Sequence, residues 1–204
     1  MLDLAILGSL YEEPLHGYEL RVRIARLSGH VRTVSHGTLY PAIKRLETAG
    51  LLTREAQPGA VAAPRHVLSL TEAGRAELQR NLREPAEPYI TDENRWFVLL
   101  AFLRHLADPA AQATVLHRRL AFLSEPSSYF YDGDTPLTAT DVDDPFRKGV
   151  LLIARATSRA ELEWLRTTLG ELAAAAEADR GTVVAQTVQD RPVARPPASN
   201  RQTR

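Results

Sequence analysis

One short segment of this 204-residue chain combines cationic and hydroxyl side chains at helical spacing. Leu39, Ile43 and Leu46 recur at i, i+4 and i+7, which predicts a helix over about 36–49 with one buried apolar face. Because each residue of a helix is rotated by about 100° from the one before it, other residues of the same helix must point away from the buried face. That outward set consists of Gly37, Pro41, Lys44 and Thr48, flanked by Tyr40 and Arg45.

The outward face is suited to binding phosphate groups. Lys44 and Arg45 supply positive charge, and the only carboxylate nearby is Glu47 at the edge, which we expect to pair with arginines of the same fold. The hydroxyls come from Thr38, Tyr40 and Thr48. The first turn of a helix also offers free N–H groups to a phosphate, and Lys and Arg can read guanine edges. We therefore expect nucleic-acid contact; the alternative is a solvated face on which Tyr40 is half-buried by packing.

The remaining reactive residue types form no catalytic or metal-binding pattern. The chain has no Cys, and its six histidines include no pair spaced as H-x3-H. No Gly-rich phosphate loop follows a predicted strand. The acidic residues within 132–144 resemble a calcium loop, but they lack its glycine at position six and its bidentate Glu at position twelve. We expect no enzyme activity, no metal and no cofactor.

The order of the elements around this segment predicts a fold. Helices are expected over 2–10, 17–27 and 36–49, and Pro41 should lie in the first turn of the third because it has no N–H. Two short strands at 51–55 and 66–70 enclose a Pro/Gly loop, and Thr71 is suited to cap a further helix. Three helices, a hairpin and a helix are the order of a winged helix-turn-helix. The predicted fold class is mainly α with a small β-hairpin wing.

The second half of the chain is predicted to be all α. Helices are expected over 92–106 and, after the cap Asp108-Pro109, through Leu123, followed by an acidic and aromatic loop over 126–145. A long helix over about 146–179 carries two apolar seams: the first contains Phe146, Val150, Ile153, Ala160 and Trp164, and the second contains Leu162, Leu165, Leu169 and Leu172. The first 84 residues alone cannot cover a helix of this length, so we expect a second helix system, from another subunit, to cover it. We expect three parts: a DNA-binding domain at 1–84, a helical dimerisation or effector domain at 85–180, and a disordered basic tail at 181–204.

Charge is distributed unevenly although Lys+Arg and Asp+Glu both number 25. The net formal charge is +2 over residues 1–84, −6 over 85–179 and +4 over 180–204. A positively charged N-terminal part is consistent with a nucleic-acid partner. The absence of Cys, of a membrane-length apolar stretch and of a signal peptide predicts a soluble cytoplasmic protein without a membrane partner.

Several spaced motifs in the first 84 residues are similar to those of the PadR-type transcriptional regulators. They are His16-Gly17-Tyr18-Glu19-Leu20, the run Ser35-His36-Gly37-Thr38-Leu39-Tyr40-Pro41-Ala42-Ile43-Lys44-Arg45-Leu46-Glu47, Gly50-Leu51-Leu52, and Leu70-Thr71-Glu72-Ala73-Gly74. The resemblance implies a homodimer whose third helices enter the major groove of double-stranded operator DNA, with the wing near the minor groove or the backbone. The wing tip at 58–64 carries no charge, so we expect the wing to bind DNA through Arg65 and His66 at its base.

The expected DNA-binding residues combine the helix face with its neighbours. They are Tyr18, Ser35, His36, Gly37, Thr38, Tyr40, Pro41, Lys44, Arg45, Arg54, Arg65 and His66. The function that follows is a repressor that binds a palindromic operator and responds to a ligand. The alternative is a winged-helix module that recognises proteins and binds no specific DNA.

Aromatic residues of the second half are the candidate effector site. The resemblance implies a response to small aromatic or drug-like molecules, and Trp96, Tyr89, Phe130 and Trp164 could line a pocket for them. The alternative is that Trp96 and Trp164 are core and dimer-seam residues of amphipathic helices.

Overall fold

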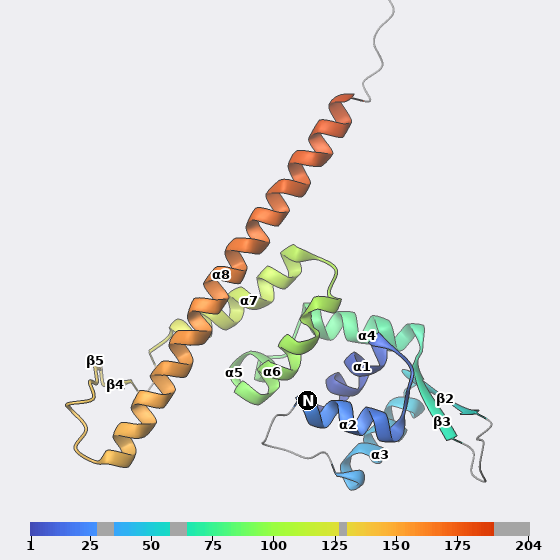
Figure 1. Ribbon diagram of the computed structural model, residues 1–204, viewed down its shortest axis with the longest axis horizontal. Coiled ribbons are helices and arrows are strands. Elements are labelled where there is room, and N and C mark those ends of the chain that lie inside the picture. Colours follow the sequence, from blue (N-terminus) through green and yellow to red (C-terminus); the bar gives the residue numbers. More distant parts are fainter. Residues whose placement is uncertain (28–34, 58–64, 127–129, 190–204) are drawn as a thin grey trace, which may run out of the picture.

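The computed structural model describes residues 1–27, 35–57, 65–126 and 130–189, and it is mainly helical with a small antiparallel sheet (Figure 1). The predicted fold class is confirmed. The N-terminal elements are α1 (Leu2–Glu12), β1 (Leu15–His16), α2 (Gly17–Leu27), α3 (His36–Thr48), β2 (Leu52–Gln57), β3 (Arg65–Leu70) and α4 (Glu72–Arg83). The C-terminal elements are α5 (Pro88–Thr91), α6 (Glu93–Phe102), the 3-10 turn η1 (Leu103–His105), α7 (Pro109–Ser124), β4 (Tyr131–Asp132), β5 (Thr135–Pro136) and α8 (Pro145–Gln189).

Helix α1 is the centre of the N-terminal part. It packs against α2, α3, α4 and α6, and every residue from Leu4 to Leu10 is buried. A helix that is apolar nearly all round must be enclosed on all sides, and α1 meets this requirement because its neighbours surround it. α2 adds Leu20 and Ile24 to the same core.

The wing is a three-stranded sheet in the order β1-β3-β2. β2 and β3 pair in antiparallel register from Leu52 opposite Leu70 to Gln57 opposite Arg65, as the predicted hairpin requires. The two-residue strand β1 was not predicted, and it adds Leu15 opposite Leu68. A strand of two residues is too short to show an alternating pattern, so the sequence near β1 does not predict this pairing.

The turn into α4 joins the wing to the helices. The predicted cap is confirmed: the Thr71 hydroxyl accepts a hydrogen bond from the Gly74 amide at 3.0 Å and donates to the Gly50 carbonyl at 2.7 Å. Gly50 has a φ of +72°, which favours glycine. A Cβ on Gly74 would lie 2.1 Å from the Leu51 carbonyl oxygen, so only glycine fits there.

The core continues across the predicted boundary at 85–91. α5 occupies residues 88–91 of this stretch, and Ile90 is buried in the core that also contains residues of α1 and α6. At Gly8 an added Cβ would lie 2.5 Å from the Phe102 ring, so α1 and α6 are in close contact. One helix was expected over 92–106. The structure has the α-helix α6, which ends at Phe102, followed directly by the 3-10 turn η1 over Leu103–His105. One core thus contains residues from both sides of the predicted boundary at 84/85. The division of the chain into two domains at this point remains a prediction.

Helix α8 is longer than expected. It runs to Gln189, so the prediction that disorder begins at 181 is wrong for 181–189; residues 190–204 lie outside the described part. Gly181 is tolerated within the helix, and the first proline of this stretch is Pro192. The expected loop over 126–145 contains the small hairpin of β4 and β5. Figure 1 shows α7 lying along α8, whose C-terminal half extends away from the other helices.

Candidate nucleic-acid interface

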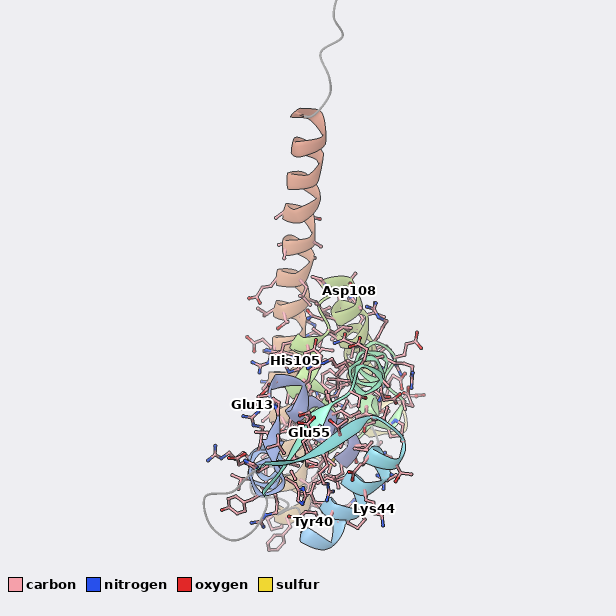
Figure 2. The ribbon with its side chains drawn as sticks, turned by 90° about the vertical axis from the view of Figure 1, so that its right-hand side faces the viewer. Glu13, Tyr40, Lys44, Glu55, His105 and Asp108 are labelled. Atoms are coloured by element: carbon pink, nitrogen blue, oxygen red, sulfur yellow. The ribbon has the colours of Figure 1, made fainter. Side chains whose placement is uncertain are left out.

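Helix α3 presents the two faces that its sequence predicts. Leu39, Ile43 and Leu46 are buried, whereas the outward residues are exposed. Those exposed residues are Gly37, Thr38, Pro41, Lys44, Arg45 and Thr48. Tyr40 and Lys44 lie at the α3 end of the molecule, apart from Asp108 (Figure 2). The cationic face is therefore accessible to a macromolecular partner.

The start of α3 differs from the expectation in one respect. The helix begins at His36, so Pro41 lies in the second turn and not in the first. Because Pro41 has no N–H, the Gly37 carbonyl receives no backbone hydrogen bond from four residues ahead. Ser35 makes no side-chain cap bond; its hydroxyl is 3.1 Å from the Thr38 hydroxyl.

The charged residues around α3 differ in how far they are already paired. Arg45 forms an ion pair with Asp3 of α1, and its side chain is 61% exposed. Arg54 of the wing is 3.3 Å from Glu47, which confirms that Glu47 pairs with an arginine of the same fold. Lys44 is exposed and forms no ion pair with any residue that the structure describes. Lys44 is thus the charge on this face that is readiest to meet a phosphate.

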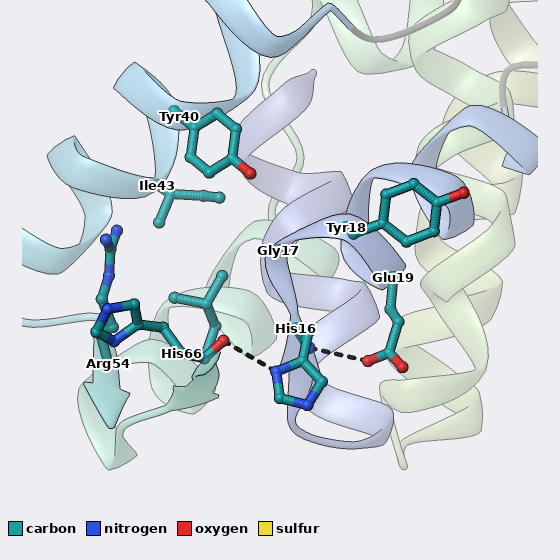
Figure 3. Close-up of a pocket in the computed structure, with 9 residues that line it drawn as sticks. His16, Gly17, Tyr18, Glu19, Tyr40, Ile43, Arg54 and His66 are labelled. Carbon is teal, nitrogen blue, oxygen red and sulfur yellow. Dashed lines mark hydrogen bonds between the residues drawn. The ribbon is translucent and has the colours of Figure 1, made fainter. Parts of the chain in front are cut away.

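A pocket of about 470 Å³ lies where α2, α3 and the wing meet (Figure 3). It brings together four predicted site residues from separate parts of the chain, namely Tyr18, Tyr40, Arg54 and His66. Tyr40 also borders Gly17, where an added Cβ would lie 3.5 Å from its hydroxyl. At 44% exposure Tyr40 is both a packing residue and a surface residue, and Tyr18 is 65% exposed.

Two residues that were not predicted as site residues hold this pocket in shape. The His16 ring lies with Nδ1 3.1 Å from the His66 carbonyl oxygen, and the His16 amide donates to Glu19 at 3.0 Å (Figure 3). These bonds connect β1, the start of α2 and the wing. His16 and Glu19 both belong to the motif His16-Gly17-Tyr18-Glu19-Leu20, and this motif was the feature of the sequence that could have pointed to them.

The side chains of His36 and Arg65 and the wing tip at 58–64 lie outside the described residues. The backbones of His36 and Arg65 are in α3 and β3. Their roles remain predictions.

The four candidate effector residues lie in different surroundings within the described part of the chain. Trp96 is fully buried in the core beneath the Arg119 guanidinium, which confirms the alternative interpretation for this residue. Tyr89 is half-buried, and burial raises its pKa, with Asp3 adding to the effect. Trp164 is 41% exposed on α8, and Phe130 borders a different cavity, between α7 and α8.

Two further observations concern the described residues alone. They contain no cluster of three or more His, Cys, Asp or Glu side chains arranged to hold a metal ion. Within the same part of the chain, no helix combines the length and the apolar character needed to cross a membrane.

The elements of residues 2–83, with the hairpin between the third and fourth helices, define a winged helix-turn-helix. Residues 6–80 match the sequence profile of the Transcriptional regulator PadR-like family. Over these residues the chain is similar to that family, and the resemblance of the sequence motifs is confirmed.

The chain is also similar to a relative whose name describes a role in transcription. The chain is 33% identical over 89 residues to the probable transcriptional regulator Rv1176c of Mycobacterium tuberculosis (strain ATCC 25618 / H37Rv), a match that covers 41% of this chain and 44% of the relative. The chain thus spans less than half of that relative's length.

Solved structures resemble the chain more loosely. The putative transcriptional regulator TA0346 from Thermoplasma acidophilum is 26% identical, with 39% of this chain and 75% of that chain covered and a TM-score of 0.37. PadR of Bacillus subtilis in complex with operator DNA is 24% identical, with 84% and 98% covered and a TM-score of 0.39.

Proposed function

We propose that this protein is a DNA-binding transcriptional regulator of the cytoplasm that acts as a homodimer on a palindromic operator, as a repressor released by a ligand. The observation that carries the proposal is the exposed, carboxylate-poor face of α3 beside the tyrosine-lined pocket. The similarity of residues 6–80, which contain this face, to the PadR-like family supports the assignment.

In this proposal α3 enters the major groove. Lys44 approaches phosphates or guanine edges without first breaking an ion pair within the described residues. Arg45 and Arg54 are paired with Asp3 and Glu47, but these are surface pairs of small net energy, so exchange for a phosphate costs little. Tyr18 and Tyr40 supply hydroxyls at the edge of the same surface.

The dimer is proposed to form along the uncovered seam of α8. Leu165 and Leu169 of the second seam are buried against the rest of the chain, with α7 beside α8. The first seam is exposed to water: Phe146 by 83%, Val150 by 49%, Ile153 by 70% and Trp164 by 41%. Large apolar side chains exposed in a row favour association, and a two-fold dimer would present two α3 helices to half-sites about one DNA turn apart.

The test combines DNA selection with a salt titration. The full chain selects DNA from a random pool, and the affinity for the selected site is measured by gel shift at several salt concentrations for the wild type and Lys44→Ala. Each phosphate contact contributes about 0.9 to the slope of log K against log salt. We expect Lys44→Ala to weaken binding several-fold and to lower the slope by about this amount.

The matched control is Lys148→Ala, because Lys148 is the other lysine of the chain and lies in α8, away from α3. It should leave affinity and slope unchanged. Unchanged binding by Lys44→Ala would remove this residue from the interface. Failure to select any DNA would favour a winged-helix module that recognises proteins.

A further inference from the structure

Tyr18 is an exposed aromatic residue at the edge of the pocket between α2, α3 and the wing. It is 65% exposed, and its hydroxyl points away from Tyr40 (Figure 3). An exposed side chain that rotates freely loses conformational entropy when a partner orders it, and this loss weakens binding. A neighbour that fixes the Tyr18 ring beforehand removes that cost.

Arg21 is the neighbour that lies over the Tyr18 ring. The two residues are three apart in α2, so they lie on the same side of the helix. The central carbon of the Arg21 guanidinium is 5.4 Å from the centre of the ring, which is within the range of a cation–π contact. A guanidinium is flat and stacks on an aromatic ring, whereas the compact ammonium group of a lysine does not.

Arg21 is held in this position although its burial is unfavourable. The residue is half-buried, and its Nε is buried with no hydrogen-bond partner among the residues that the structure describes. A buried donor without a partner is uncommon in folded proteins and calls for a reason. Arg23 of the same helix is different, because it pairs with Glu12 and Glu13. Within the described part of the chain, the Tyr18 ring is the group that attracts the Arg21 charge.

We propose that Arg21 is a positioning residue for DNA binding, which holds the Tyr18 ring so that the Tyr18 hydroxyl faces the DNA backbone. Arg21 acts through Tyr18 and reads no base itself. It is absent from the set of DNA-binding residues expected from the sequence, because its charge alone does not distinguish it from the other arginines of α2, Arg23 and Arg26.

This inference rests on the proposed function, since Tyr18 contacts a phosphate only if the chain binds DNA. The packing of Arg21 on Tyr18 is a property of the free protein. Two experiments therefore separate the contact from its consequence.

The first experiment measures, by gel shift, the affinity of the full chain for the DNA that it selects, in the wild type, Arg21→Lys, Tyr18→Phe and the double variant. Arg21→Lys keeps the charge and loses the flat group that stacks on the ring. We expect it to weaken binding about two- to fivefold per subunit, the factor that corresponds to an exposed cation–π contact, and to leave the salt slope unchanged. Because Tyr18→Phe already lacks the hydroxyl, adding Arg21→Lys to it should cause no further loss.

Arg75→Lys is the matched control for DNA binding. Arg75 of α4 lies over the ring of Tyr11 at 5.2 Å, so it makes the same kind of contact outside the predicted DNA-binding residues. Its replacement should leave the affinity for DNA unchanged. Thermal unfolding of each variant verifies that it is folded.

The second experiment needs no DNA. It follows the Nε–H resonance of Arg21 in the proton–nitrogen NMR spectrum of the full chain, where the resonance is assigned by its loss in Arg21→Lys. We expect this resonance to move in Tyr18→Leu, because the ring no longer shields it, and the Arg75 resonance to stay in place.

Three results would overturn the proposal: unchanged DNA affinity in Arg21→Lys, an undiminished loss when this change is added to Tyr18→Phe, or an Arg21 resonance that does not move in Tyr18→Leu. The second of these would make Arg21 a direct DNA contact and not a positioning residue. Failure to select any DNA would overturn the proposed function and the role of Arg21 with it, whereas the NMR measurement would still show whether Arg21 holds the Tyr18 ring.

Discussion

The buried Arg119 offers the sharpest test of how the helices are joined. Its guanidinium, on α7, bonds both carboxylate oxygens of Glu161 on α8, at 2.7 and 2.9 Å, and donates to the Ile90 carbonyl at 2.6 Å. It also lies 5.3 Å from the centre of the Trp96 ring. The Arg119 side chain is 4% exposed and that of Glu161 12%. One residue thus connects α5, α6, α7 and α8.

Arg119→Met keeps most of the apolar stem but removes the charge. The Glu161 carboxylate then remains buried without its partner, and the Ile90 carbonyl loses its donor. Removing one partner of a buried pair costs about 3–5 kcal/mol, because the other charge is left uncompensated. We expect the free energy of unfolding to fall by this amount. In Arg119→Met/Glu161→Leu only the Ile90 carbonyl is orphaned, so the loss should be about 1–3 kcal/mol.

Urea unfolding at one fixed protein concentration measures both variants, since a dimer's stability depends on concentration. Arg80→Met is the control: Arg80 pairs with Glu77 at the surface, where its side chain is 65% exposed, and its loss should cost about 1 kcal/mol or less. A loss below about 1 kcal/mol for Arg119→Met would refute the reasoning. The reasoning would also be refuted if Arg119→Met/Glu161→Leu were no more stable than Arg119→Met.

Two other predictions test the wing junction and the junction of α1 with η1. Gly74→Ala places a Cβ against the Leu51 carbonyl oxygen, so urea unfolding should show a loss of about 1–3 kcal/mol; unchanged stability would contradict this close contact. Burial lowers the pKa of His105 below its usual 6.5, against the opposing effect of its Glu12 partner. The unfolded chain therefore takes up a proton below about pH 6.5 that the folded chain does not, so stability should fall as the pH drops through this range. His105→Gln should flatten that dependence in unfolding curves recorded from pH 7.5 to 5.5, whereas the exposed His117→Gln should preserve it; identical slopes would count against the assignment.

The sequence alone determined the local elements and the faces of α3. Apolar residues at helical spacing placed Leu39, Ile43 and Leu46 inside and Lys44 outside, because burial follows the period of the helix. The cap at Thr71 was likewise predictable, since capping depends on neighbours within one turn. The spaced motifs also predicted the similarity of residues 6–80 to the PadR-like family.

Only the tertiary structure decided what the distant residues do. It paired β1 with the wing, placed Asp3 beside Arg45, and buried Arg119 against Glu161. It also divided the aromatic residues of the second half between the core, the exposed seam of α8 and the cavity between α7 and α8. These contacts join residues far apart in the chain, so no local period or capping pattern encodes them. They depend on how the helices pack around α1, and that packing exists only in three dimensions.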